Sequence, residues 1–428
     1  MQLSTRLSRH PAPAVLWAEG ASDEGLLARA EKWARTLRLA GLSRGARLVS
    51  TLANGPDFAG ALVACWEMGV TFVPLSPTLA PEERRRRIDA VRAAAVLGPQ
   101  GVVPEAPGAQ IPPDPTDRAA VILFTSGSQG DARPVALSEA ALVHVAETHA
   151  VALGMGEGVR VLGYLPWSHA FGFTLELLAS LLCGAHLRYV PPSRFPQALA
   201  EGGADFLFTV PRMLGQTDSA ALRTLAGGIV GGAPVRGALR QCLSRTRLRV
   251  GYGQTECGPG VTLGGAGEWE EDDFLGRPVG CQVELGAADE GDARELCVRG
   301  SNLALGYLDD GRVVPLAQKN ASLPTGDLVT PTADGGFTFQ GRRDELFKLD
   351  NGRMVNPVPL ERPFDGRILL VSGRHAVQPL ARGVPPHAFD LPLPHLKPLA
   401  MPESFWEACT TPTGKVSRAR AQQLFDQL

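Results

Sequence analysis

The sequence predicts an α/β protein that continues into a smaller β-rich section and a short C-terminal domain. Strand-like and helix-like stretches alternate through the first two-thirds of the chain, which is typical of a parallel sheet covered by helices on both faces. After about Gly260 the apolar segments become short and are broken by Gly, Asp and Pro, as in an antiparallel, barrel-like section. The last part, from about Arg342 to Leu428, is expected to form a small tail domain, because its middle holds too many prolines for a helix or a central strand.

The N-terminal elements follow one another in a regular order. Residues 24–42 repeat apolar side chains at helical spacing, and residues 46–54 are expected to form a strand that ends at a turn. A helix over residues 57–70 and a strand over residues 71–77 come next. The same alternation recurs at residues 140–154, 159–166, 174–184 and 185–191, and short strands are expected at residues 281–286, 293–300, 304–308 and 337–344.

Length and composition indicate a soluble globular protein with a small-molecule partner. At 428 residues the chain is long enough for two or three domains. A formal net charge of −2, with 44% hydrophobic and 20% charged residues, favours neither nucleic acid nor an anionic membrane as a partner. Seven scattered cysteines without a Cys-x-x-Cys pair indicate neither disulfides nor a zinc site, so we expect a reducing cytoplasm.

We expect neither a secretory signal nor a membrane span. The first twenty residues lack an unbroken apolar core. No later stretch reaches the length of about 18 apolar residues that a spanning helix needs.

Two other features are interpreted as structural. In residues 81–94 two glutamates precede Arg86 and Arg87 by four residues on an expected helix, which favours a solvated, salt-bridged face over a nucleic-acid patch. His144 and His149 lie five residues apart, so they do not form the i,i+4 pair of a helical metal site.

The stretch "LFTSGSQGDARPV" (residues 123–135) has the composition of a phosphate-binding loop. A strand over residues 119–124 leads into it, and the loop combines glycines, which permit close ligand approach, with hydroxyl donors. The loop residues are Thr125, Ser126, Gly127, Ser128 and Gly130. Backbone N–H groups presented in this way suit a phosphate. The loop does not end in Gly-Lys-Ser/Thr at the start of a helix, so a P-loop NTPase is not predicted.

A series of short motifs follows this loop along the chain. They are "LPWSHAFG" (165–172), "GGAP" (231–234), "GYGQTE" (251–256), "LGRPVG", "ELCVRG", "LGYL", "PTGDL", "GRRDELFKLDNGRMVNPVPLE" and "PTGKVSR". Together with the loop they resemble, in order, the motifs of the adenylate-forming superfamily of acyl-CoA synthetases, luciferases and peptide-synthetase adenylation domains. The loop departs from the family's T-S-G-S-T-G-x-P-K-x-V pattern at Gln129, Ala132 and Arg133, which replace Thr, Pro and Lys. The resemblance covers nearly the whole chain.

The resemblance implies a two-domain architecture. A large N-terminal domain (residues 1–341) would contain two α/β-layered sheets and a small distorted β-barrel, and a small mobile α+β domain (residues 342–428) would follow. In this family the small domain rotates about a hinge residue, here Asp344, between two half-reactions. The expected activity is that of an ATP-dependent acid–thiol ligase, which forms acyl-AMP, releases pyrophosphate and transfers the acyl group to a phosphopantetheine thiol.

The resemblance also implies a site for ATP and Mg²⁺. The loop residues would hold the β- and γ-phosphates, with Arg133 in place of the family's lysine. Glu256, a hard anionic ligand, would bind Mg²⁺, and Thr255 would contact the α-phosphate. Asp327 would accept hydrogen bonds from both ribose hydroxyls, and Arg342 would reach the ribose or a phosphate. The remaining nucleotide-binding residues are Gly232, Ala233, Pro234, Tyr252, whose ring would stack on adenine, and Gly253.

Two further residues are implied to act on the acid. His169 would line the acyl pocket near the carboxylate, together with Trp167, Phe171 and Gly232. Lys415 in "PTGKVSR" would bridge the carboxylate and the α-phosphate, where negative charge develops in the transition state.

The acid and the acceptor stay open at this point. The tail is shorter than is usual in the family, in the region that shapes the pantetheine passage, so the acceptor is either CoA or an acyl carrier protein. The segment around "SHAFGFTLEL" looks more like the fatty-acyl branch, and an aryl acid such as a hydroxybenzoate or cinnamate is the alternative. A different possibility is a non-catalytic relative that only binds an adenylate or acyl group, which the retained Glu256, Asp327, Arg342 and Lys415 argue against.

Overall fold

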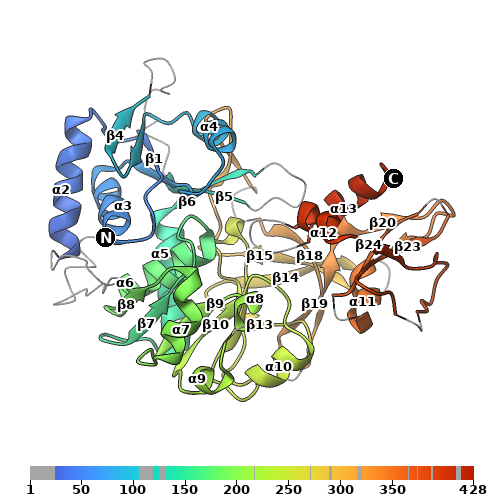
Figure 1. The fold of residues 1–428 in the computed structure, drawn as a ribbon. Coiled ribbons are helices and arrows are strands. Elements are labelled where there is room, and N and C mark those ends of the chain that lie inside the picture. The colour runs from blue at the N-terminus through green and yellow to red at the C-terminus, as the bar shows by residue number, and fades with distance from the viewer. Residues whose placement is uncertain are drawn as a thin grey trace.

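The structure, a computed structural model, describes most of the chain. The described residues are 25–105, 119–125, 132–215, 217–269, 271–288, 292–316, 321–364, 366–373, 375–386, 389–410 and 416–428. They form two large sheets, a two-stranded sheet and a three-stranded sheet (Figure 1). Helices cover the large sheets, so the expected α/β class is confirmed.

The first large sheet has the strand order β17-β16-β6-β5-β2-β1-β3-β4. Its strands are β1 (Arg47–Ser50), β2 (Thr71–Pro74), β3 (Ala95–Gly98), β4 (Gly101–Pro104), β5 (Ala119–Phe124), β6 (Pro134–Ser138), β16 (Gly306–Asp309) and β17 (Arg312–Pro315). β1 pairs in parallel with β2 and β3, and β2 pairs in parallel with β5. Parallel strands need a crossover connection, which here is supplied by helices.

Alternating side chains of these strands enter two different cores, because successive residues of a strand point to opposite faces. Leu48 and Phe72 belong to the core that also contains buried residues of α2 (Leu26–Leu39) and α3 (Pro56–Met68). Val49 and Val73 belong to a second core with Ile88 of α4 (Pro81–Ala90). The sheet is therefore covered on both faces, as the sequence predicts.

The second large sheet combines a parallel half with an antiparallel half, in the order β14-β15-β18-β19-β13-β12-β11-β10-β9-β7-β8. The parallel half contains β7 (Arg160–Gly163), β8 (His186–Tyr189), β9 (Phe206–Thr209), β10 (Gly227–Gly231) and β11 (Arg249–Tyr252). The antiparallel half contains β12 (Thr262–Leu263), β13 (Phe274–Pro278), β14 (Gln282–Ala288), β15 (Arg294–Arg299), β18 (Leu323–Pro331) and β19 (Phe337–Arg342). The change near Gly260 is thus confirmed, and the antiparallel strands continue the edge of the parallel sheet.

Helices connect and cover this second sheet. They are α5 (Glu139–Leu153), the π-helix η1 (Gly172–Leu178), α6 (Ala179–Leu182), α7 (Phe195–Ala200), α8 (Pro211–Leu214), α9 (Ser219–Arg223) and α10 (Gly237–Leu243). The helix expected at residues 174–184 is present, but most of it is a π-helix that continues into the short α6.

One strand lies in a different sheet from the one its sequence position suggested. Residues 304–308 were expected within the antiparallel section, but β16 pairs with β6 of the first sheet and forms a hairpin with β17. At Gly306 a Cβ atom would lie 2.1 Å from the carbonyl oxygen of Val314, so only glycine permits this close approach. The pairing brings Tyr307 next to the end of the phosphate loop.

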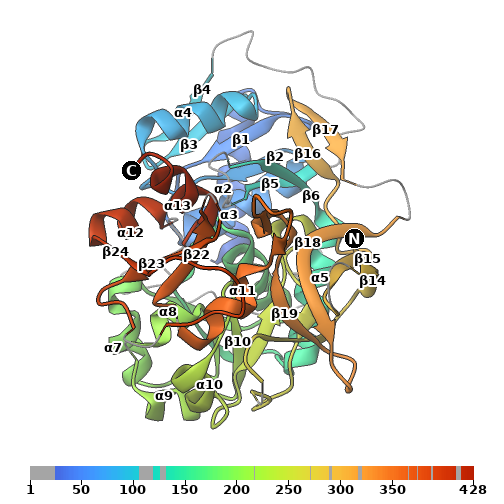
Figure 2. The same ribbon diagram turned by 90° about the vertical axis from the view of Figure 1, so that its right-hand side faces the viewer.

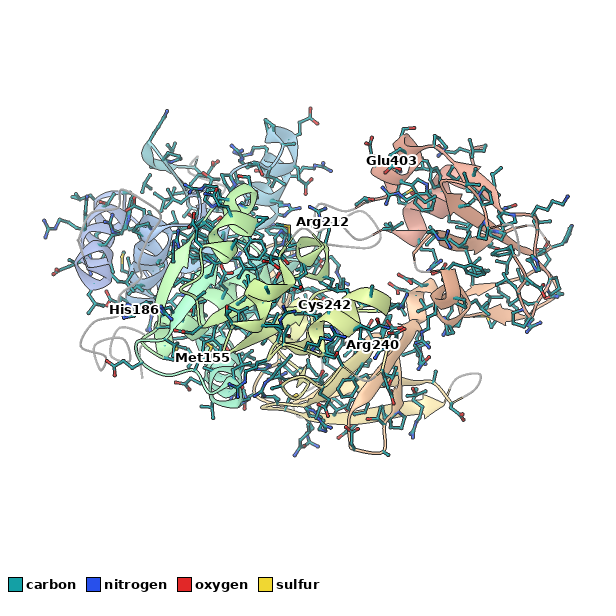
Figure 3. The ribbon with its side chains drawn as sticks, turned by 60° about the horizontal axis from the view of Figure 1, so that its bottom comes forward. Met155, His186, Arg212, Arg240, Cys242 and Glu403 are labelled. Atoms are coloured by element: carbon teal, nitrogen blue, oxygen red, sulfur yellow. The ribbon has the colours of Figure 1, made fainter. Side chains whose placement is uncertain are left out.

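The C-terminal residues build a small α+β unit of their own. Its strands are β20 (Phe347–Lys348), β21 (Met354–Val355), β22 (Ile368–Ser372), β23 (Val377–Arg382) and β24 (Leu399–Met401), and its helices are α11 (Pro357–Glu361), α12 (Glu403–Cys409) and α13 (Arg418–Phe425). Two small cores lie on either side of β22 and β23. Figure 2 shows the two C-terminal helices beside β22 and β23, and in Figure 3 the part that carries Glu403 stands to one side of the part with Met155 and His186. The predicted boundary after residue 341 falls at the end of β19 and stays a prediction.

Two chemical expectations can be compared with the structure. All seven cysteines are free thiols. Among the described residues, none of the helices combines the length and the apolar character that a membrane-spanning segment requires.

Candidate active site

The two ends of the phosphate loop are held together by their own backbone and one hydroxyl. The Thr125 N–H donates to the carbonyl of Arg133 over 2.9 Å, and the Arg133 N–H donates to Thr125 Oγ1 over 3.1 Å. β5 and β6 flank the loop and pair antiparallel up to Phe124. The predicted phosphate ligands between these ends, Ser126, Gly127, Ser128 and Gly130, lie outside the described residues. Their roles stay predictions.

Arg133 and Glu256 are joined through a residue for which the sequence suggested no role. The guanidinium carbon of Arg133 lies 3.4 Å from the centroid of the Tyr307 ring, which is within cation–π range. The Tyr307 hydroxyl donates to Glu256 Oε1 over 2.7 Å. Burial, and then the charge of Glu256, raise the pKa of Tyr307, so this hydroxyl stays a donor. The signal for Tyr307 was its place in the "LGYL" motif.

The Glu256 carboxylate suits the magnesium ion that the family resemblance implies. Glu256 lies in the 3-10 turn Thr255–Cys257 that follows β11. Within the described residues its second oxygen, Oε2, accepts no hydrogen bond. Mg²⁺ is usually bound by one or two carboxylates, with water and substrate phosphates completing the shell. A single carboxylate close to a phosphate loop fits this pattern.

A second cluster gathers three of the predicted nucleotide-binding residues. The Tyr252 hydroxyl donates to Asp327 Oδ2 over 2.5 Å, and Arg342 Nη1 donates to Asp327 Oδ1 over 2.9 Å. Asp327 and Arg342 face each other across β18 and β19. Asp327 is buried, and burial together with this carboxylate raises the pKa of Tyr252 well above its usual value. A carboxylate offers about four acceptor sites, which makes Asp327 a suitable group for the hydroxyls of a ribose.

The two clusters are linked because Tyr252 and Glu256 belong to one short segment. Gln254 between them donates to the Thr325 carbonyl over 3.4 Å, which ties "GYGQTE" to "PTGDL". A Cβ atom on Gly253 would lie 1.4 Å from the Pro259 carbonyl oxygen, so this position excludes any side chain. In the part of the chain that the structure describes, the hydroxyl of Thr255 has no hydrogen-bond partner, and it is available to a ligand.

The "GGAP" segment lies next to the predicted acyl segment. It starts at the end of β10, and Gly232 has a φ of +81° that favours glycine. A Cβ atom on Gly231 would lie 3.6 Å from the ring of Phe171. The structure therefore brings the start of this segment, at Gly231, next to Phe171, and the roles of Gly232, Ala233 and Pro234 stay predictions.

The acyl segment around His169 is held by side chains from two other elements. Asn54 donates to the Leu165 carbonyl over 2.7 Å and accepts from the Trp167 N–H over 3.0 Å. Glu176 of η1 accepts from the Tyr164 and Leu165 N–H groups and from Trp167 Nε1. Burial, and then the charge of Arg87, lower the pKa of His169, which is therefore neutral near pH 7.

The prediction that Trp167 lines the acyl pocket is not supported. Its side chain is fully buried, its indole nitrogen is bonded to Glu176, and its ring packs against Phe58 and Tyr189. A tryptophan in such a position packs in the core and stabilises the backbone of the segment. His144 and His149 are structural, as expected: each has a ring nitrogen bonded to a backbone carbonyl, of Gly280 and Val145 respectively.

The charge run on α4 is only partly a solvated face. Arg85 and Arg86 are exposed and pair with Asp89 and Glu83. Arg87 departs from the expectation, because its side chain is 21% exposed and its guanidinium carbon lies 4.8 Å from the centroid of the Phe124 ring. The sequence could not show which arginine points at the sheet.

Lys415 lies outside the described residues, but the ends of its loop are described. Thr410 and Val416 form a β-bridge, and the Ser417 N–H donates to the Cys409 carbonyl over 2.8 Å. Arg418 is buried and forms a bidentate pair with Glu361. The loop with Lys415 is therefore anchored at both ends in the C-terminal unit.

The predicted hinge residue Asp344 lies in the 3-10 turn Arg343–Glu345 that follows β19. It accepts a hydrogen bond from Arg342 Nε over 2.9 Å. The carboxylate at the expected hinge is thus connected, through Arg342, to Asp327 of the nucleotide cluster.

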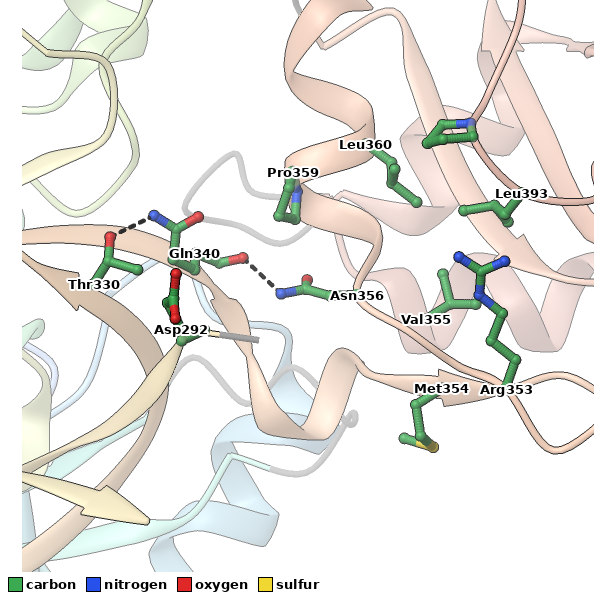
Figure 4. A pocket seen from close by; sticks show the side chains of 12 residues that line it. Asp292, Thr330, Gln340, Arg353, Met354, Val355, Asn356, Pro359, Leu360 and Leu393 are labelled. Carbon is green, nitrogen blue, oxygen red and sulfur yellow. Dashed lines mark hydrogen bonds between the residues drawn. The ribbon is translucent and has the colours of Figure 1, made fainter. Parts of the chain in front are cut away.

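A cavity of about 380 Å³ lies between the antiparallel strands and the C-terminal unit (Figure 4). Thr330, Gln340, Arg353 and Asn356 are among its lining residues, and Asn356 donates to the Gln340 carbonyl over 3.0 Å. None of the predicted site residues lines it. The cavity is therefore distinct from the clusters around Glu256 and Asp327.

Comparison with known proteins identifies the family. A family model described as AMP-binding enzyme matches residues 9–110 and 99–308. The chain belongs to the AMP-binding enzyme family, which is part of the adenylate-forming superfamily. The resemblance stated from the motifs is thereby confirmed.

Curated relatives differ in their named activities. The probable 4-coumarate–CoA ligase 3 of Dictyostelium discoideum is 27% identical over 277 residues, which are 58% of this chain and 49% of that protein. Novobiocin biosynthesis protein H of Streptomyces niveus is 28% identical over 405 residues, 81% of this chain and 66% of that protein. The AMB antimetabolite synthetase AmbE of Pseudomonas aeruginosa is 27% identical over 415 residues, 84% and 19% respectively. The chain thus spans less than two-thirds of the length of these relatives.

Solved structures share the fold. ATP-bound MatB from Rhodopseudomonas palustris superposes with a TM-score of 0.81 at 18% identity, covering 99% of this chain and 98% of that one. O-succinylbenzoate coenzyme A synthetase (MenE) from Bacillus subtilis, in complex with AMP, gives a TM-score of 0.80 at 18% identity, with 97% and 96% covered. At this identity the likeness establishes the fold alone.

Proposed function

We propose that this protein is an ATP-dependent acid–thiol ligase, which converts a fatty or aryl acid to acyl-AMP and then to a thioester of CoA or of an acyl carrier protein. One observation carries the proposal: Tyr252 and Glu256, four residues apart, contact Asp327 and Tyr307. These partners come from different sheets, so the short segment joins a candidate ribose site to a candidate metal and phosphate site. Family membership supports the same reaction class.

The first half-reaction needs positive charge around the phosphates and a fixed nucleotide. Asp327 would hold the ribose, and Tyr252 and Arg342 would orient this carboxylate. Arg133 and the loop after Thr125 would bind the β- and γ-phosphates. Mg²⁺ held by Glu256 would supply a Lewis acid that neutralises phosphate charge. His169, neutral at pH 7, would lie beside the acid without repelling or attracting its carboxylate strongly.

The small domain would complete the site in this proposal. Lys415 would approach the acid carboxylate and the α-phosphate and stabilise the charge that develops as pyrophosphate leaves. Rotation about Asp344 would then move this lysine away from the site and open the passage through which the thiol approaches. We place the domain boundary after residue 341 for this reason. The seven free thiols fit a reducing cytoplasm.

The test is acid-dependent ATP–pyrophosphate exchange over a panel of fatty and aryl acids, followed by thioester assays with CoA and with a carrier protein. Exchange with at least one acid is expected. Exchange without a CoA thioester, together with thioester formation on a carrier protein, would identify a carrier protein as the acceptor. The absence of exchange with every acid would contradict the proposal and favour a non-catalytic binding protein.

The role of Lys415 has its own test, because the two half-reactions can be assayed separately. Lys415→Ala is expected to lower acyl-AMP formation at least about a hundredfold, as does removal of a donor from an oxyanion site, and to spare thioester formation from supplied acyl-AMP. Lys397→Ala, at an exposed position of the same unit, serves as the matched control. Equal loss in both half-reactions would refute the role.

A further inference from the structure

Arg87 differs from its neighbours on α4 in how it is held. Its guanidinium carbon lies 4.8 Å from the centroid of the Phe124 ring, and its Nε lies 2.8 Å from Glu83 Oε1. Its side chain is 21% exposed, against 70% for Arg86, which pairs with the other oxygen of Glu83. Arg87 is therefore packed onto the sheet, while Arg86 is in solvent.

The position of Phe124 in the first sheet shows where the positive charge of Arg87 lies. Phe124 is the last residue of β5, and Thr125 after it begins the phosphate loop. α4 follows β2, which pairs in parallel with β5, and Arg87 in the last turn of α4 contacts Phe124 at the carboxyl end of β5. The charge of Arg87 is also close enough to His169 to lower the pKa of that imidazole further. The guanidinium thus lies against the residue that precedes the phosphate loop, and within electrostatic range of His169 in the acyl segment.

Among the described residues, the terminal nitrogens of Arg87 have no hydrogen-bond acceptor. Glu83 accepts from Nε, and no described residue accepts from Nη1 or Nη2. Glu83 divides its charge between Arg86 and Arg87, so this region of α4 keeps an excess of positive charge. A guanidinium whose face rests on an aromatic ring presents its N–H edge in a fixed direction.

A second arginine is held in the same way at the other end of the loop. Arg133 rests on the ring of Tyr307, with its guanidinium carbon 3.4 Å from the centroid. The two arginines are stacked on rings of different elements, and the loop begins after Phe124 and ends at Arg133. Phe124 belongs to the core on one face of the first sheet and Tyr307 packs against the core on the other face, so the two arginines flank the loop from opposite sides. Arginine binds phosphate oxygens bidentately, and two arginines offer donors to more than one phosphate group.

We propose that Arg87 is a polyphosphate-binding residue that acts with Arg133 to bind the β- and γ-phosphates of the nucleotide and the pyrophosphate that leaves. The proposal deepens the proposed function and rests on its nucleotide site. The ligand class is a pyrophosphate or nucleoside triphosphate bound with Mg²⁺. AMP, which lacks these phosphates, would not contact Arg87.

The experiment measures binding by calorimetry in the absence of any acid, so it does not depend on turnover. The probes are inorganic pyrophosphate with Mg²⁺, ATP with Mg²⁺, and AMP. Arg87→Ala is expected to weaken pyrophosphate and ATP binding about tenfold to a hundredfold, the usual loss for a hydrogen bond to a charged group, and to leave AMP binding unchanged. Arg87→Lys keeps the positive charge but lacks the planar guanidinium. Its affinity for pyrophosphate and ATP is expected to lie between those of Arg87→Ala and the wild type.

Arg86→Ala is the matched control, since Arg86 lies on the same helix, shares Glu83 and is exposed. It should bind all three probes as the wild type does, and thermal unfolding midpoints should establish that every variant is folded. The inference is overturned if Arg87→Ala weakens AMP as much as ATP, if it resembles Arg86→Ala, or if the wild type does not bind pyrophosphate. Arg87→Ala could selectively lose pyrophosphate and ATP binding while the wild type shows no exchange with any acid. That result would support this inference and contradict the proposed ligase activity.

Discussion

The buried carboxyl group of Glu176 makes a quantitative prediction about stability and pH. Glu176 is fully buried on η1, where its two oxygens accept from the Tyr164 and Leu165 N–H groups and from Trp167 Nε1. Burial outweighs these three donors and raises the pKa of Glu176 from its ordinary value to about 8. The folded protein therefore keeps a proton on this group that the unfolded chain loses.

The sign and size of the effect follow from proton linkage. Between about pH 4.5, where an unfolded glutamate ionises, and about pH 8, the folded state binds more protons than the unfolded state. The free energy of unfolding from this group thus falls as the pH rises through that window. At about 1.4 kcal/mol per pH unit, the loss over the window is about 5 kcal/mol.

The perturbation is Glu176→Gln, which keeps the shape but cannot ionise. The variant should lose this pH dependence, so its free energy of unfolding relative to the wild type should rise by about 5 kcal/mol between pH 4.5 and pH 8. The measurement is urea unfolding followed by tryptophan fluorescence over this pH range. Glu67→Gln, at an exposed site, should give a difference that does not change with pH. A constant difference for Glu176→Gln as well would refute the reasoning.

Two further outcomes follow from single contacts. Tyr252→Phe removes the hydrogen bond to Asp327, whose charged acceptor makes it worth about 1.5–3 kcal/mol, so ATP binding measured by calorimetry should weaken at least about tenfold. An unchanged affinity would contradict the assignment of Asp327 to the ribose. Asp273→Asn removes the buried charge shared by Arg236 and Arg362, and the free energy of unfolding in urea should fall by about 3–5 kcal/mol. Arg382→Ala breaks an exposed pair with Glu403 and should lower the free energy of unfolding by less than about 1 kcal/mol. If Asp273→Asn and Arg382→Ala lowered it equally, the conclusion that burial strengthens the Asp273 pairs would be wrong.

Much of the architecture could be predicted from local patterns. The alternation of strands and helices and the change near Gly260 are periodicities of neighbouring residues, and such periodicities report which faces of an element are buried. The motifs from "TSGSQG" to "PTGKVSR" predicted the family, because close backbone approach and ligand contact restrict the residue types at each position. Asp327, Arg342, Tyr252 and Glu256 were named from these motifs, and the structure brings them into two linked clusters.

Contacts between distant segments were decided only by the tertiary structure. The pairing of β16 with β6 joins residues about 170 positions apart, and it alone brings Tyr307 between Arg133 and Glu256. Likewise, the four arginines of α4 look alike in the sequence, and only packing against Phe124 distinguishes Arg87 from Arg86. The assignment of Trp167 to the acyl pocket failed for the same reason. Its motif could not show that the indole nitrogen would donate to the buried Glu176 in the core. Local composition determines which elements form, whereas burial of a given side chain depends on the surface that another part of the chain brings against it.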